Sequence, residues 1–146
     1  MAGYLISDID SSGMDESWHS ISNIGDTSSG AILAEVCAKA GSPWFSGHFP
    51  KEPILPGIAM LAMVTDTITH HEAAKGRRIR ISAIRRVRFK LPVRPDESLR
   101  ISLSLSDQEG EFFYHFRIEL DGKTVCTGIA VAETLPDESQ AHEVFS

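Results

Sequence analysis

The sequence predicts an α+β domain in which an antiparallel β-sheet wraps around one long central α-helix. Residues 58–74 contain no proline or glycine, and their first two turns are apolar on nearly every side. A helix of this kind is buried all round instead of lying on a surface. Four stretches with alternating apolar residues follow it, over 79–91, 99–105, 112–120 and 125–133. A sheet that curls around the helix is the simplest way to cover it.

The central helix is predicted to begin at Gly57 and to end near Ala74. Prolines at positions 50, 53 and 56 fix their own φ angles and keep the preceding residues extended, so no helix forms before Pro56. Polar residues from Thr65 onward indicate that the second half of the helix emerges from the core. His70 and His71 are adjacent and cannot share a helix face, so we expect both in a solvated helix end.

The remaining elements follow from local signals. Arg85 falls on the apolar side of its strand, which predicts a β-bulge or a buried partner. Asp121-Gly122 predicts a tight hairpin turn, and the small residues of 125–133 predict close backbone packing. We expect a single domain over residues 1–146, with an N-terminal extension over 1–29 and a mobile tail over 134–146. A short helix around Met14–Ser20 is possible within the extension.

The composition argues against several classes of protein. The longest uncharged apolar run, 53–64, is too short and too rich in proline to span a bilayer, and the N-terminus does not resemble a signal peptide. No Cys/His cluster has metal-ligand spacing and no glycine-rich phosphate loop is present, so we expect neither metal nor cofactor. Cys37 and Cys126 could pair, but reduced core thiols of a cytoplasmic protein fit their apolar surroundings better.

The loop before the helix carries the candidate chemistry. His48 lies in a segment stiffened by proline, which suits holding one side chain in a defined place. The first backbone N–H groups of the helix, from Gly57 onward, lack intrahelical partners and carry partial positive charge. A histidine that faces such a helix end can act as a base on a carbonyl compound, while the N–H groups hold its oxygen. A structural or solvated histidine is the alternative.

These motifs resemble a known family. His48-Phe49-Pro50 and Pro53-Ile54-Leu55-Pro56-Gly57 are similar to the signature of the hot-dog-fold (3R)-hydroxyacyl-acyl-carrier-protein dehydratases of the FabZ and FabA type. Residues 88–93 and 121–125 resemble the C-terminal strands of that family, and the similarity covers roughly residues 30–133. The resemblance also favours a strand over 31–40, whose composition alone fits either a helix or a strand.

The resemblance implies a mechanism and an assembly. In the family, the base removes the α-proton of a 3-hydroxyacyl thioester, the acid protonates the departing hydroxyl, and the helix N–H groups hold the thioester oxygen. His48 is then the base and Gly57 supplies the oxygen site. Because the base and the acid come from different subunits, the resemblance implies a homodimer, a larger assembly of dimers, or a heterodimer with a second hot-dog subunit. The implied acyl-chain contacts are Phe49, Ile54, Leu55, Pro56, Ile58, Leu61 and Ala62.

The sequence departs from the family pattern at the acid. The family carries a carboxylate five residues after the glycine, where this chain has Ala62. Asp66 lies one turn further along the same helix face and can replace it through a water, or it can be structural. A partner subunit can supply the acid instead. A third possibility is that elimination has been lost, which leaves a non-catalytic subunit that binds acyl thioesters, or an acyl thioesterase that uses Asp66.

Charge is distributed unevenly along the chain. Residues 75–100 carry ten Lys or Arg and two acidic residues, a net charge of +8, whereas the remainder carries −14 and the whole chain −6. This basic stripe indicates an anionic partner, or it is an exposed strand face that happens to be basic. No aromatic interleaving accompanies it, so we do not expect nucleic acid. The resemblance implies an acidic acyl carrier protein or a coenzyme A phosphate, received by Arg85, Arg86, Arg88, Lys90 and Arg94.

Overall fold

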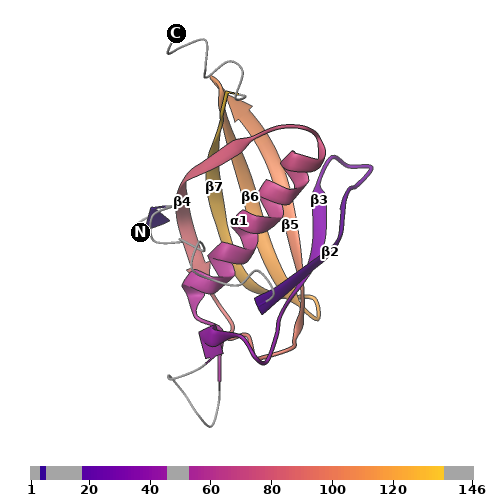
Figure 1. The fold of residues 1–146 in the computed structure, drawn as a ribbon, viewed down its shortest axis with the longest axis vertical. Helices are drawn as coiled ribbons and strands as arrows, with labels where there is room; N and C mark the ends of the chain where they lie inside the picture. Colours follow the sequence, from indigo (N-terminus) through magenta and orange to yellow (C-terminus); the bar gives the residue numbers. More distant parts are fainter. Residues whose placement is uncertain (1–3, 6–17, 46–52, 137–146) are drawn as a thin grey trace.

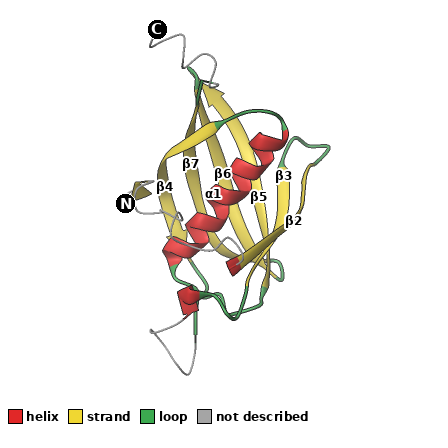
Figure 2. Ribbon diagram, viewed as in Figure 1, coloured by secondary structure: helices red, strands yellow, loops and turns green. Residues whose placement is uncertain are grey.

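The fold is a seven-stranded antiparallel sheet that wraps around one long helix (Figures 1 and 2). The computed structural model describes residues 4–5, 18–45 and 53–136. The strands lie in the order β1-β4-β7-β6-β5-β3-β2, so segments distant in sequence become neighbours. The predicted α+β architecture, a curled sheet around a central helix, is confirmed. Its strands are β1 (Tyr4–Leu5), β2 (His19–Asp26), β3 (Ile32–Ala38), β4 (Ile79–Phe89), β5 (Ser98–Gln108), β6 (Glu111–Leu120) and β7 (Lys123–Thr134).

The helix α1 (Gly57–Ala74) crosses the inner face of the sheet (Figure 1). Every residue from Ala59 to Val64 is buried, which confirms the prediction that its first turns are covered on all sides. The second half emerges only in part. Thr69, His70 and Ala73 are exposed, but one side stays in the core through Thr67, Ile68, His71 and Glu72. The expectation that the helix leaves the core at Thr65 was therefore wrong for this side.

Strands β5, β6 and β7 form a continuous meander whose alternation matches the sequence pattern. On β6, Tyr114, Phe116 and Ile118 are buried, while His115 and Arg117 between them are exposed. The turn at Asp121-Gly122 has φ angles of 51° and 79°, as the hairpin prediction requires. The predicted close packing on β7 is also confirmed, because a Cβ added to Gly128 would lie 2.5 Å from the Phe116 ring.

The predicted bulge at Arg85 is confirmed. The register between β4 and β7 shifts between Arg85 and Arg88, and Arg86 adopts a φ of 56° there. An earlier register shift between Ile81 and Ala83 makes Ile84 the buried residue, so Arg85 faces outward, and the shift at Arg85 then leaves Val87 buried. Strand β4 ends at Phe89, two residues before the predicted limit of the alternating stretch.

The N-terminal part of the domain contains a strand that the sequence analysis missed. Residues expected to be an extension form β2, which pairs with β3 as the last strand of the sheet. The possible short helix around Met14–Ser20 was wrong at His19 and Ser20, which are in β2, and Met14 to Ser17 lie outside the described residues. Residues 31–40 do contain the strand expected, β3. The tail was expected from 134, but Thr134 ends β7 and Leu135 donates a backbone hydrogen bond to Arg78.

The C-terminal end of α1 is fixed by a buried polar network. Glu72 is 2% exposed, accepts a hydrogen bond of 2.8 Å from the Tyr114 hydroxyl, and pairs with Arg77 at 2.7 Å. His71 is 6% exposed and its Nε2 lies 3.0 Å from Asp26 Oδ1. The prediction of a solvated pair of histidines is therefore right for His70 and wrong for His71. The adjacency rule placed the two side chains on different faces, and the tertiary fold buries one of those faces.

Candidate functional site

The start of α1 presents backbone donors without partners. Pro56 is the N-cap, and its carbonyl accepts from Ala59 and Met60 at 3.0 and 3.3 Å. The described residues provide no acceptor for the N–H groups of Gly57 and Ile58, and no side chain among them caps the helix. These N–H groups lie at the positive end of the helix dipole, so they can bind an oxygen that carries negative charge.

The approach to this helix end is held by the β4–β5 connection. Leu55 donates a backbone hydrogen bond of 2.7 Å to Val93, which ties the proline-rich segment to that connection. The Phe89 ring covers the Cα of Gly57, because a Cβ added there would lie 2.5 Å from the ring. The Phe89 side chain is 42% exposed, so an apolar ring borders the helix end. A glycine at position 57 is therefore favoured by packing against Phe89 as well as by the close approach of a ligand oxygen.

The residues proposed from the sequence fall into three groups. His48 and Phe49 lie outside the described residues, so their positions remain predictions. Leu55, Leu61 and Ala62 belong to the hydrophobic core, with 3%, 0% and 4% exposure. Ile54, Pro56, Gly57 and Ile58 are half-buried around the helix start. The last group is the part of the proposed acyl-contact set that can meet a ligand without rearrangement of the core.

Asp66 contacts a histidine that the sequence analysis did not select. His19 Nε2 lies 3.0 Å from Asp66 Oδ2, within ion-pair distance but without hydrogen-bond alignment. The His19 side chain is 4% exposed and that of Asp66 is 26% exposed, and the Trp18 ring packs against His19 at 4.1 Å between centroids. The signal that could have selected His19 is its alternation with Ile21 in a strand, and that strand was not predicted.

Both residues line a cavity of about 390 Å³ between β2 and the second half of α1. Thr69, His70 and Ala73 line it from the helix, and Ile21 and Ile24 from β2. Its lining extends along the helix away from Gly57 and includes neither Gly57 nor Ala62. The structure therefore places Asp66 in a separate cavity from the helix start.

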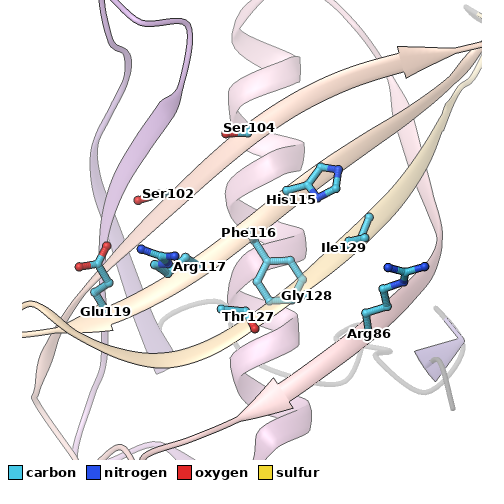
Figure 3. Close-up of a pocket in the computed structure, with 10 residues that line it drawn as sticks. All are labelled: Arg86, Ser102, Ser104, His115, Phe116, Arg117, Glu119, Thr127, Gly128 and Ile129. Carbon is cyan, nitrogen blue, oxygen red and sulfur yellow. The ribbon is translucent and has the colours of Figure 1, made fainter. Parts of the chain in front are cut away.

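The basic stripe divides between the edge and the outer face of the sheet. Arg85, Arg86, Arg88, Lys90 and Arg94 are all exposed. Arg86 lines an outer groove of about 490 Å³ together with Arg117 and His115 of β6, and Figure 3 shows these side chains on the face of the sheet opposite α1. The lining also contains the hydroxyl groups of Ser102, Ser104 and Thr127, the carboxylate of Glu119, and the less polar residues Phe116, Gly128 and Ile129. The sequence analysis missed Arg117 because it lies outside residues 75–100.

Burial and hydrogen bonds shift the pKa values of several side chains. Burial raises the pKa of the Cys126 thiol to about 12, and burial also raises the pKa of Cys37. Burial and the hydrogen bond to Glu72 raise the pKa of Tyr114 well above its usual range. Hydrogen bonds from His71 and Lys75 lower the pKa of Asp26. Both cysteines are unpaired, and no cluster of three potential metal ligands occurs within the described part of the chain.

Comparison with known proteins identifies the family. The sequence model of the ApeI-like family, described as ApeI dehydratase, matches residues 25–129. The chain belongs to the ApeI-like dehydratase family. It is 33% identical to a 3-hydroxyacyl-[acyl-carrier-protein] dehydratase FabZ of Nitratiruptor sp., over 70% of this chain and 73% of that protein. A FabZ of Magnetococcus marinus is 29% identical, over 77% of each chain. The resemblance to hydroxyacyl-acyl-carrier-protein dehydratases is thus confirmed.

Solved structures agree on the fold. A dehydratase heterocomplex, ApeI:P from Xenorhabdus doucetiae, matches with a TM-score of 0.62 and 23% identity, over 77% of this chain and 96% of that chain. A thioesterase from Pseudomonas aeruginosa matches with a TM-score of 0.60 and 11% identity, over 79% and 81%. Structural similarity at such low sequence identity establishes a shared hot-dog fold and no more. No helix in the described residues has the length and apolar character needed to cross a membrane.

Proposed function

We propose that this protein is a dehydratase subunit that eliminates water from 3-hydroxyacyl thioesters in fatty-acid or polyketide-type synthesis. The observation that carries the proposal is the pair of N–H groups at Gly57 and Ile58 that have no acceptor among the described residues, and these groups follow the His48 motif in a chain of a dehydratase family. Two of the relatives are described as 3-hydroxyacyl-[acyl-carrier-protein] dehydratases. The two free cysteines support a cytoplasmic location.

The proposed reaction assigns one task to each group. His48 takes the α-proton of the 3-hydroxyacyl thioester as general base. The N–H of Gly57 donates to the thioester oxygen, which gains negative charge as the α-carbon loses its proton. An acid then protonates the 3-hydroxyl, the C3–O bond breaks and water leaves, which yields the enoyl thioester. Ile54, Pro56 and Ile58 can contact the acyl chain beside the helix start.

The acid is best supplied by a second hot-dog subunit. Ala62 has no proton to donate, and Asp66 is paired with His19 in a cavity whose lining excludes the helix start. Asp66 lies about 6 Å further along the helix axis than Ala62, since each residue rises 1.5 Å. One similar structure is described as a dehydratase heterocomplex, which supports a heterodimer. Under this proposal, this chain contributes the base and the oxygen site, and its partner contributes the carboxylate.

The acyl group is proposed to arrive on an acidic carrier protein or on coenzyme A. Arg85, Arg86, Arg88, Lys90 and Arg94 are exposed, and none of them takes part in an ion pair within the described residues. Arg88→Glu should weaken carrier binding at low salt, whereas Lys123→Glu, an exposed charge outside the stripe, should not. High salt should reduce the difference, because charges are screened over about 8 Å at physiological ionic strength. Equal affinities would exclude this surface.

The proposal is tested by following enoyl formation and free thiol together with 3-hydroxyacyl thioesters. The chain alone should be nearly inactive, and addition of a second hot-dog subunit with an intact acid should restore dehydration. His48→Ala should then lower the rate by about 10²-fold or more, without unfolding the protein. Dehydration that survives His48→Ala would refute the assignment of the base.

Two further variants separate the sources of the acid. Asp66→Asn should change the rate little if a partner supplies the acid, and by about 10²-fold if Asp66 acts through water. Ala62→Glu should give the homodimer measurable dehydration, because it restores a carboxyl in an apolar pocket that keeps part of it protonated. Release of free thiol without enoyl product would instead favour an acyl thioesterase. Binding of the acyl thioester without turnover, even with the partner subunit, would favour a non-catalytic subunit.

A further inference from the structure

The cavity between β2 and α1 contains an incomplete polar arrangement. His19 is nine-tenths buried and lines the cavity, yet neither of its ring nitrogens has a hydrogen-bond partner among the described residues. Buried polar groups are normally paired, so an unpaired one beside a cavity calls for an explanation. Asp66, which lies against His19, is the partly exposed member of the pair and faces solvent through the cavity.

The polar groups around the cavity mainly accept hydrogen bonds. Asp66 uses Oδ2 for His19, and the described residues give Oδ1 no partner. The Thr69 hydroxyl already donates to the Thr65 carbonyl at 2.9 Å, so it has only lone pairs left to offer. Among the described residues, no lysine or arginine lines the cavity, so a carboxylate or phosphate would meet Asp66 without a fixed positive partner. The Asp66 oxygen that faces the cavity therefore lacks a hydrogen-bond donor, whereas the His19 nitrogens are closed off from the cavity.

The rest of the cavity lining favours a ligand with an apolar part. Ile21, Ile24 and Ala73 form its apolar wall, and the exposed Thr69 and His70 form its rim. A volume of about 390 Å³ lies within the range typical of small-molecule sites. A hydroxyl suits the polar end, because it can donate to the free oxygen of Asp66 without bringing a further charge against the apolar wall.

We propose that this cavity binds a small apolar molecule with a hydroxyl group that donates a hydrogen bond to Asp66. His19 is a positioning residue: it lies against Asp66 and holds the carboxylate toward the cavity. The site is distinct from the helix start at Gly57, and the proposal does not depend on the dehydratase activity. The ligand can be a free alcohol, or the hydroxylated end of a longer molecule.

The test is a titration of the full chain with cyclohexanol, followed by amide and methyl NMR shifts. Cyclohexanol should cause saturable shifts at Ile21, Ile24 and Thr69 in the millimolar range, and cyclohexanecarboxylate should cause none. Asp66→Ala should weaken the affinity about tenfold, the usual effect of losing one hydrogen bond to a charged group. Asp26→Ala is the matched control, because it removes the carboxylate of the other His–Asp pair on α1, and it should leave the affinity unchanged.

Two more variants keep the proposal open to refutation. Ala73→Leu changes an exposed helix residue, should fold normally, and should block the cavity. His19→Phe keeps the stacking against Trp18 but removes the imidazole that holds Asp66, so the ratio of the affinity for cyclohexanol to that for methylcyclohexane should fall by about tenfold. A merely structural role of His19 would not alter this ratio. The proposal fails if cyclohexanol does not bind at these residues, if Asp66→Ala binds it like the wild type, or if the selectivity of His19→Phe is unchanged.

Discussion

Two histidine–aspartate pairs link α1 to the N-terminal part of the chain, and they differ in what surrounds them. His71 and Asp26 lie 3.0 Å apart, as do His19 and Asp66. The first pair is part of a larger network: Lys75 binds the other oxygen of Asp26 at 3.2 Å, and His71 Nδ1 lies 3.5 Å from Glu72. The second pair ends at a cavity. The distance between two groups therefore does not by itself indicate their role.

The difference shows how one helix can serve stability and binding at separate places. At its C-terminal end, Glu72 has the Tyr114 hydroxyl and the Arg77 guanidinium as partners, so a buried charge is compensated. At Asp66, the unpaired imidazole nitrogens of His19 carry a desolvation cost, on the order of 1–3 kcal/mol per group. We expect substitutions in the network around Glu72 to affect the free energy of unfolding, and substitutions in the His19–Asp66 pair to affect ligand binding.

The largest expected effect is from Glu72→Ala. The change leaves the Tyr114 hydroxyl buried without a partner and opens a cavity in the core, so the free energy of unfolding should fall by about 3 kcal/mol. Urea denaturation measures it. Glu111→Ala, at an exposed carboxylate on β6, is the control and should change stability by less than about 0.5 kcal/mol. A loss below about 1 kcal/mol for Glu72→Ala would contradict the view that this network is structural.

Tyr114→Phe should follow in size. Phenylalanine keeps the buried ring but removes a hydrogen bond to a charged group, which costs about 1.5–3 kcal/mol. The same denaturation assay applies. The double variant with Glu72→Ala should lose less than the sum of the two single losses, because both remove the same interaction. Full additivity would show that the two residues act independently, against the 2.8 Å contact between them.

His19→Phe should change stability by less than about 1 kcal/mol, because the imidazole nitrogens have no hydrogen bonds to lose and the stacking on Trp18 is kept. His71→Phe should cost more, about 1–2 kcal/mol, since it removes the hydrogen bond to Asp26. Thermal unfolding of the two variants side by side gives the most direct comparison of the pairs. A larger loss of stability for His19→Phe than for His71→Phe would contradict the distinction between the two pairs.

The smallest effect is expected from the pH dependence at Asp26. Its pKa is lowered from the ordinary value of 3.8, mainly by the hydrogen bond from His71 and then by that from Lys75. A lowered folded-state pKa means that the stabilisation is present above about pH 4 and is lost as the pH falls through the lower folded value. Asp26→Asn should therefore reduce the acid-induced loss of stability between about pH 4 and 2. If the pH dependence of stability were unchanged in Asp26→Asn, Asp26 would not contribute to the network.

Local sequence patterns were sufficient for most of the secondary structure. The prolines located the helix start at Gly57 because they cannot lie inside a helix, and the out-of-phase Arg85 located the bulge because strand faces alternate strictly. The motif around His48 and Gly57 predicted the family that the comparisons confirm, and Ala62 lies where the resemblance implies an acid. These signals all reside within short stretches of the chain.

Tertiary structure alone decided which of these side chains meet. In the folded chain, β2 lies beside α1. His19 therefore contacts Asp66, which is 47 residues away in the sequence, and Asp26 contacts His71, which is 45 residues away. The strand order also places Arg117 and Arg86 in one groove of the outer face, on either side of β7. No periodicity encodes such contacts, because they depend on how separate elements pack. Burial of His71 and the cavity at Asp66 are consequences of that packing, which the sequence of α1 by itself does not contain.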